Sequence, residues 1–208
     1  MKKQFDIIGF LIGWVSVITQ FILMLQNRQA GIVETIIRFF SFFTILTNTL
    51  VALYFTARAF KIKNEVFSIF YKKGTLTALT VFILVVGMVY QIILRHVWEP
   101  KGLQLIIDEM LHTINPIFVL VYWILFALRE DVNFQNIKSW LWYPVIYFAY
   151  IIIRGYFSGF YPYPFVNIPV IGYKQLFINF ILICSFIIAL SAILVAIGRK
   201  LKRNSVQP

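Results

Sequence analysis

Three polar residues share one face at the start of an apolar segment. Asp108, His112 and Asn115 follow one another at spacings of four and three residues, which bring side chains to one face of a helix. Pro116 comes next, and a proline within a helix frees a backbone carbonyl and bends the helix. An ionisable side chain at membrane depth is costly and is by default a functional candidate. The structural alternative is an interfacial histidine that is hydrogen-bonded to a neighbouring helix.

A second polar face lies in the segment FFSFFTILTNTL. Ser41, Thr44 and Asn48 share this face at helical spacing, with Thr47 beside them. A single serine or threonine in a membrane helix commonly bonds the carbonyl one turn back or marks helix packing. Counted from the predicted helix ends, however, Thr44 lies roughly 12 Å deep and His112 roughly 6 Å deep, on the same side of the membrane. A hydroxyl and an imidazole at similar depth could act as a nucleophile and its base.

The elements that position these residues are predicted to be membrane helices. The chain has 208 residues, of which 61% are hydrophobic and 13% charged, whereas soluble domains carry about 25% charged residues. The apolar runs are too long and too continuous for barrel strands. We therefore predict an all-α integral membrane protein that forms a single domain over residues 1–208, with six transmembrane helices. The predicted spans are residues 6–25, 36–57, 75–95, 109–128, 140–157 and 174–198.

The basic residues predict the orientation of these spans. With six spans both termini lie on one side, and the opposite side holds only six of the 19 lysines and arginines. These six are Arg28, Arg38, Arg95, Lys101, Arg154 and Lys174. The other thirteen, Lys202 and Arg203 among them, place both termini in the cytoplasm by the positive-inside rule. The net charge of +11 is then explained by topology and by contact with membrane lipids, which excludes nucleic acid as a partner.

Two further features bear on the outer side of the predicted helices. Arg154 ends the segment YIIIRGYF, where an arginine either extends its charge to the interface or holds a carboxylate. The candidate carboxylates are Asp108, Glu109 and the headgroup of an anionic substrate. The following loop, GYFSGFYPYPF, has the composition of a lid or of an aromatic belt.

Several classes of enzyme are excluded by missing motifs. The sequence contains no H-E-x-x-H, no G-x-S-x-G and no glycine-rich phosphate loop. Two histidines and one cysteine, Cys184, are too few for a dedicated zinc or haem site, so we expect no metal and no cofactor. The composition is rich in lysine, phenylalanine and isoleucine, which is typical of an AT-rich bacterium and predicts the bacterial cytoplasmic membrane as the location.

These motifs resemble a known family. The segments FFTILTN, LH…P and YPYPF and the sequence of Trp98–Gly102 are similar to the bacterial branch of the FAR-17a/androgen-induced family of multi-span membrane proteins, over nearly the whole chain. Lys101 interrupts the Pro-Gly pair of that family. The similarity to animal members concentrates around the threonine and the histidine. Characterised animal members are described as intramembrane threonine hydrolases that cleave fatty acid esters of hydroxy fatty acids.

The resemblance implies an acyl-transfer site. The family histidine corresponds to His112, in MLHT, and the family threonine to Thr44 or Thr47. Thr44 agrees in its distance from the start of the helix, whereas Thr47 keeps the preceding leucine. We select Thr44, with Thr47 as the alternative nucleophile. Its hydroxyl would attack a lipid ester that enters laterally from the bilayer, while His112 takes the proton.

Neighbouring polar residues suggest supporting roles that the family does not imply. Asn48 or Asn115 could donate to the oxyanion, and Asp108 could orient the histidine ring. Two other functions would use the same pocket. A small-molecule or lipid transporter would show inverted repeats and broken helices, and in a membrane scaffold the polar residues would only hold helices together.

Overall fold

The computed structural model describes residues 1–204, with the side chains of residues 1–201, and every regular element in that range is helical. The side chains of Lys202 and Arg203, counted above for orientation, lie outside the described residues. The α-helices are α1 (Lys2–Gln26), α2 (Ile32–Phe39), α3 (Phe43–Phe60), α4 (Thr75–Val89), α5 (Leu103–Glu109), α6 (Asn115–Phe126), α7 (Ile137–Trp140), α8 (Trp142–Ser158) and α9 (Ile168–Asn204). The predicted all-α class is confirmed.

Five helical segments within the described residues are long and apolar enough to cross a membrane. They are Lys2–Gln26, Phe43–Phe60, Thr75–Leu94, Leu103–Phe126 and Ile168–Leu201. The segment predicted as a span at 140–157 forms α8, a helix of 17 residues. Its aromatic side chains contact both neighbours, with ring centroids 4.8 Å apart for Tyr143 and Phe82 of α4, and 4.4 Å apart for Phe148 and Phe180 of α9.

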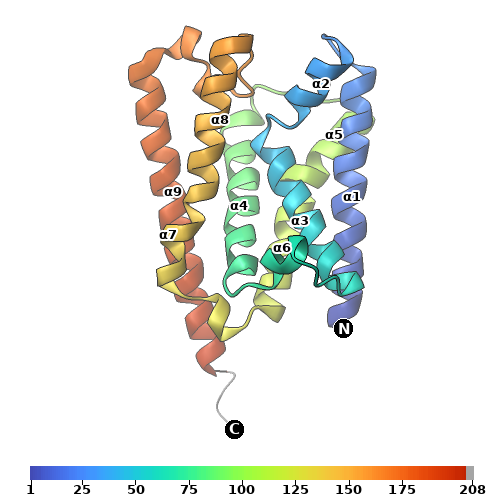
Figure 1. Cartoon of the computed structure of the whole chain (residues 1–208), viewed down its shortest axis with the longest axis vertical. Coiled ribbons are helices and arrows are strands. Elements are labelled where there is room, and N and C mark those ends of the chain that lie inside the picture. The colour runs from blue at the N-terminus through green and yellow to red at the C-terminus, as the bar shows by residue number, and fades with distance from the viewer. Residues whose placement is uncertain (205–208) are drawn as a thin grey trace.

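The helices run side by side along the long axis of the molecule (Figure 1). The first turn of α1 and the last turns of α9 lie at one end, and α2 and the loop at 159–167 lie at the other, which we call the upper end. Helices α1 and α3 approach closely, because a Cβ at Gly13 would lie 3.1 Å from the Cβ of Ala52. Small residues of this kind let membrane helices pack backbone to backbone.

The predicted span at 36–57 is wrong as one continuous helix. It divides into α2, which ends at Phe39, and α3, which begins at Phe43. A buried break in a helix needs partners for the freed backbone groups. Tyr147 of α8 supplies two, since its hydroxyl donates to the Ser41 carbonyl at 2.9 Å and accepts from the Phe43 amide at 3.2 Å. The break leaves Thr44 in the first turn of α3.

The predicted span at 109–128 starts earlier than expected, at Leu103, and contains one turn of π-helix at Met110–Ile114. Pro116 has no amide hydrogen to pair with the His112 carbonyl, four residues earlier, so the regular α-helical pattern of hydrogen bonds is interrupted next to this turn. Gly87 of α4 lies against the same carbonyl, because a Cβ there would come within 2.9 Å of the His112 oxygen. The predicted start of the last span at 174 also moves, to Ile168, with a kink at Gly172 where φ is 72°.

Candidate active site

Thr44 and His112 face each other across the interface between α3 and the π-helical turn. The Thr44 Oγ1 lies 3.3 Å from the His112 Nε2, and both side chains are buried. The His112 Nδ1 lies 2.9 Å from the backbone carbonyl of Asp108, which can only accept a hydrogen bond. This contact assigns the proton to Nδ1 and leaves the lone pair of Nε2 directed at the threonine hydroxyl. The pair therefore has the geometry of a nucleophile and a general base.

The imidazole is fixed by two further groups. Tyr90 stacks on the ring with the centroids 4.0 Å apart and the planes 12° from parallel. The Asp108 carboxylate lies beside the ring, with its Oδ1 3.5 Å from the His112 Nδ1. The Asp108 Oδ2 is buried without a hydrogen-bond partner in the described structure. A carboxylate in this position stabilises the imidazolium that forms when Nε2 takes a proton.

A tyrosine from the upper loop completes the immediate surroundings of Thr44. The Tyr163 hydroxyl accepts a hydrogen bond from the Thr44 amide at 3.3 Å and lies 3.4 Å from the Thr44 Oγ1. This residue belongs to YPYPF, which the sequence suggested only as a lid or aromatic belt. Thr44 and Tyr163 are 119 positions apart, so helical spacing cannot predict their contact. The one feature of the sequence that pointed to Tyr163 was its position between two prolines in YPYPF.

Thr47, the alternative nucleophile, is directed elsewhere. Its Oγ1 lies 3.0 Å from the Tyr143 hydroxyl of α8. It does not line the cavity that contains Thr44 and His112. The structure therefore brings one of the two candidate threonines to the histidine.

Asn48 and Asn115 tie the helices together behind the pair. The Asn48 amide donates to the backbone carbonyls of Thr44 and Leu111, at 2.9 Å and 3.3 Å. The Asn115 amide donates to the Asn48 Oδ1 at 2.8 Å and to the Ser16 hydroxyl at 2.9 Å. Both hydrogens of each amide are thus engaged inside the protein. This geometry makes the asparagines positioning residues for α3 and the π-helical turn, not oxyanion donors.

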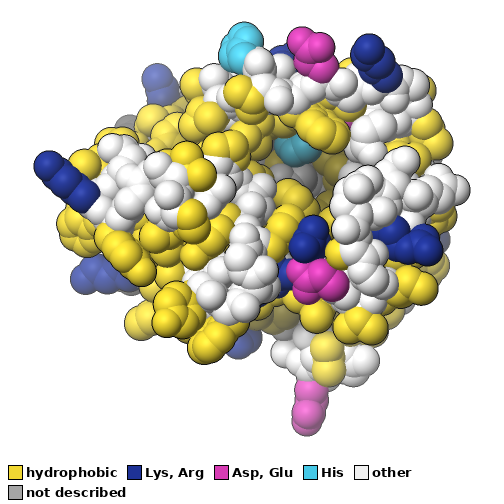
Figure 2. Space-filling view, turned by 90° about the horizontal axis from the view of Figure 1, so that it is seen from above, with side chains coloured by type: hydrophobic (Ala, Val, Ile, Leu, Met, Phe, Trp, Pro, Cys, Tyr) yellow, Lys and Arg dark blue, Asp and Glu magenta, His cyan; other side chains and the backbone are white. Residues whose placement is uncertain are grey.

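A cavity of about 540 Å³ leads from the upper end of the molecule to the pair. Thr44, His112, Asp108 and Tyr163 line its inner part, and the exposed side chain of Trp98 lies at its rim. Seen from above, this face is hollowed and a histidine side chain lies at depth in the hollow (Figure 2). The volume falls within the range of small-molecule pockets.

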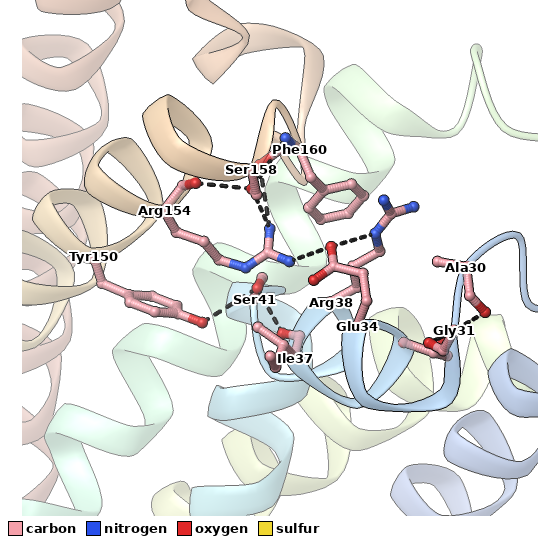
Figure 3. Close-up of polar contacts among 11 residues, drawn as sticks. Ala30, Gly31, Glu34, Ile37, Arg38, Ser41, Tyr150, Arg154, Ser158 and Phe160 are labelled. Carbon is pink, nitrogen blue, oxygen red and sulfur yellow. Dashed lines mark hydrogen bonds and ion pairs between the residues drawn. The ribbon is translucent and has the colours of Figure 1, made fainter.

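Arg154 lies in a cluster with Glu34, Arg38 and Phe160 near this rim (Figure 3). The Arg154 Nη2 and the Arg38 Nε contact the same carboxylate oxygen, Glu34 Oε1, at 2.7 Å and 2.8 Å. Both guanidinium groups also lie over the Phe160 ring, at 4.9 Å and 4.5 Å from its centroid. The partner of Arg154 is thus Glu34, and not Asp108 or Glu109 as the sequence suggested. Two cations share one anion, and Arg38 lines the cavity.

The ion pairs of Glu34 predict that the thermal stability of the protein falls at acidic pH. The hydrogen bond from Arg38 and the contact with Arg154 hold the pKa of the Glu34 carboxyl below its ordinary value of 4.5. A carboxyl whose pKa is lower in the folded than in the unfolded protein stabilises the fold fully at pH values above its unfolded pKa. This stabilisation is lost as pH falls through its folded pKa. We expect Glu34→Gln to lower the melting temperature at neutral pH. The melting temperatures of wild type and variant should converge as pH drops below about 4.5.

Thermal unfolding of the detergent-solubilised protein at several pH values measures this difference. Glu65→Gln is the matched control, because Glu65 is an exposed acid that forms no ion pair with the described side chains. A constant gap between wild type and Glu34→Gln across the pH range would argue against the ion-pair cluster.

Comparisons with protein-family models, with curated proteins and with solved structures found no match. Among the described residues no group of three or more histidine, cysteine, aspartate or glutamate side chains could hold a metal ion. The site is thus defined by its own geometry. It consists of a buried hydroxyl, an oriented imidazole, a tyrosine hydroxyl and an open cavity.

Proposed function

We propose that this chain is a membrane-embedded hydrolase of lipid esters, with Thr44 as nucleophile and His112 as general base. The observation that carries the proposal is the 3.3 Å contact between the Thr44 Oγ1 and the His112 Nε2 at the floor of an open cavity. A contact of this length suits a resting site, since catalytic hydrogen bonds shorten when substrate binds. The resemblance to the threonine hydrolases of the FAR-17a/androgen-induced family supports the same pair of residues.

The reaction is acyl transfer in two steps. The Thr44 oxygen bonds to the ester carbonyl carbon as its proton passes to the His112 Nε2. The same proton then goes to the leaving alcohol as its carbon–oxygen bond breaks, which leaves an acyl-threonine. Water then attacks this second ester as its proton passes to the His112 Nε2. His112 returns this proton to the Thr44 oxygen as the acyl–oxygen bond breaks, which releases the fatty acid and restores the hydroxyl. Asp108 balances the positive charge on the ring during both steps.

The negative oxygen formed in each step needs hydrogen-bond donors. The asparagine amides donate to other protein groups and the Thr44 amide donates to the Tyr163 oxygen, whereas the Tyr163 hydroxyl itself lies 3.4 Å from the Thr44 Oγ1. The start of α3 adds the positive end of its helix dipole. We assign oxyanion stabilisation to the Tyr163 hydroxyl, which is held in place by the Thr44 amide and turns its own hydrogen toward the oxyanion.

Tyr163→Phe is expected to lower kcat by about 10²- to 10³-fold, the usual effect of removing one oxyanion donor. The KM should change little, because the ring still fills its place. Steady-state hydrolysis of a chromogenic ester measures both constants. Tyr161→Phe is the matched control, since the Tyr161 hydroxyl contacts neither Thr44 nor His112. Equal kcat in wild type and Tyr163→Phe would remove Tyr163 from the mechanism.

The proposed location is the cytoplasmic membrane of a bacterium, with α8 as a sixth span and both termini in the cytoplasm. Two observations support this topology. The first turn of α1 and the end of α9 lie at the same end of the molecule, which requires an even number of crossings (Figure 1). The excess of lysine and arginine belongs to the connections and termini at that end. The site then opens toward the outer leaflet, where lipid esters are available.

The proposed substrate is a fatty acid ester of a hydroxy fatty acid. Arg38 supports an anionic substrate, because its guanidinium lines the cavity within a cluster of two cations and one anion. The test is the release of fatty acid from such an ester by the purified protein in lipid nanodiscs, compared with the Thr44→Ala/His112→Ala double variant. Release by wild type alone supports the function. Equal release by the double variant would assign the activity to a contaminant.

A further inference from the structure

A second, apolar cavity also reaches Thr44. It has a volume of about 70 Å³ and lies among α3, α4, α8 and α9, and we call it the α8–α9 crevice. Its walls include Val86, Ile151 and Ile187, all buried. Three residues line both cavities, namely Thr44, Leu94 and Tyr163. The candidate nucleophile therefore stands at the boundary between the open cavity, whose lining includes His112, Asp108 and Arg38, and a crevice that is lined almost wholly by hydrocarbon.

The crevice reaches the surface between α8 and α9. Phe148, Phe180 and Cys184 line it and are partly exposed, and the two phenylalanine rings are in contact beside Cys184, with their centroids 4.4 Å apart. The adjoining surface of α9 carries the exposed apolar side chains Ile181 and Leu182. Since α9 belongs to a membrane-crossing segment, this surface faces lipid chains.

We propose that the α8–α9 crevice binds the acyl chain of the ester, while the alcohol portion occupies the open cavity above His112. This inference rests on the proposed function and specifies how its substrate divides at Thr44. The crevice lining is almost wholly hydrocarbon, so it favours the methylene groups of the acyl chain over the alcohol portion, which carries a carboxylate. Since a cavity of about 150 Å³ holds benzene, this one takes roughly the first three carbons of a chain. The remaining carbons leave beside the Phe148–Phe180 pair, past the partly exposed Cys184, into the surrounding lipid.

The single cysteine provides a direct test. Cys184 lies in the crevice wall, so an arylmaleimide attached to it fills the opening without touching His112 or Asp108. The probes are two alkyl fluorophosphonates, one with an ethyl chain and one with a decyl chain, and the readout is their rate of covalent labelling. We expect blocked protein to react about tenfold more slowly with the decyl probe, equivalent to losing about two packed methylene groups, and as before with the ethyl probe.

Two variants keep the test independent of maleimide access. Cys184→Phe narrows the same opening and should reproduce the selective loss with the decyl probe. Cys184→Ser/Ile181→Cys moves the thiol to an exposed position outside the crevice, so blocking it should change neither rate. If Cys184→Phe reacts with both probes at wild-type rates, the crevice does not hold the chain and the hydrolase proposal stands. If wild type takes up neither probe, the hydrolase proposal fails and this one fails with it.

Discussion

Thr44→Ala is expected to lower ester turnover by at least about 10³-fold, because it removes the atom that forms the covalent intermediate. Losses of that size follow removal of the nucleophile in hydrolases, where the remaining activity comes from binding and oxyanion stabilisation alone. The cavity and the histidine remain in place. The measurement is kcat/KM for a chromogenic ester, with circular dichroism and thermal unfolding to show that the variant is folded.

Thr47→Ala is the matched control, one helical turn from Thr44 on the same helix. Its hydroxyl contacts Tyr143 and not His112, so the substitution removes one buried hydrogen bond, costs about 1 kcal/mol of stability and leaves turnover nearly unchanged. Thr44→Ser keeps the hydroxyl and should retain measurable turnover. If Thr47→Ala abolished turnover and Thr44→Ala did not, the assignment of the nucleophile would be reversed.

His112→Ala is expected to cause a loss comparable to that of Thr44→Ala, because a hydroxyl without its base is a weak nucleophile at neutral pH. Residues that act as one unit are not additive, so the double variant should be little worse than either single variant. Turnover of the three variants at one pH measures this relation. Multiplicative losses in the double variant would show that the two side chains act separately.

Asp108→Asn tests whether the Asp108 carboxylate or its backbone carbonyl orients the His112 ring. In a conventional catalytic triad the carboxylate alone does so. The His112 Nδ1 bonds the backbone carbonyl of Asp108 at 2.9 Å, and that carbonyl stays in the variant. Only the carboxylate oxygen at 3.5 Å is replaced. We therefore expect a smaller loss of kcat for Asp108→Asn than for His112→Ala. Equal losses would mean that the carboxylate, and not the carbonyl, fixes the tautomer.

The helical class and the proximity of the hydroxyl cluster to His112 follow from local rules, whereas the choice of Thr44 over Thr47 rested on the family resemblance. Long apolar runs predict helices at membrane depth, and polar residues at three- and four-residue spacing predict which face turns inward. Depths of roughly 12 Å and roughly 6 Å along the predicted helices placed the hydroxyls and the imidazole on the same side of the membrane, although both helices begin at other residues than predicted. These arguments use only neighbours in the chain and the thickness of a membrane.

The remaining features of the site depend on contacts between distant segments. The break between α2 and α3 exists because Tyr147, more than a hundred positions away, supplies hydrogen bonds to Ser41 and Phe43. Periodicity cannot show such a break, because the segment is apolar on both sides of it. The same limit applies to Tyr163, which reaches Thr44 from a loop. For Arg154 the choice among several carboxylates depended on the position of α2.

Asn48 and Asn115, whose amide hydrogens are all donated within the protein, show a second limit of prediction from sequence. Their type and depth predict that Asn48 and Asn115 need several partners, and the structure supplies those partners from backbone carbonyls and from each other. Composition alone cannot separate an amide that is used for helix packing from one that is free for a ligand. That distinction requires the hydrogen-bond partners of each amide hydrogen.

Identification of the labelled residue tests the central claim most directly. Wild-type protein would be reacted with a fluorophosphonate, digested, and analysed by tandem mass spectrometry for the peptide that carries the phosphonate. We predict a single adduct on Thr44, absent from His112→Ala and from protein unfolded before labelling. An adduct on Thr47, or a folded wild type that carries none, would contradict Thr44 as the nucleophile.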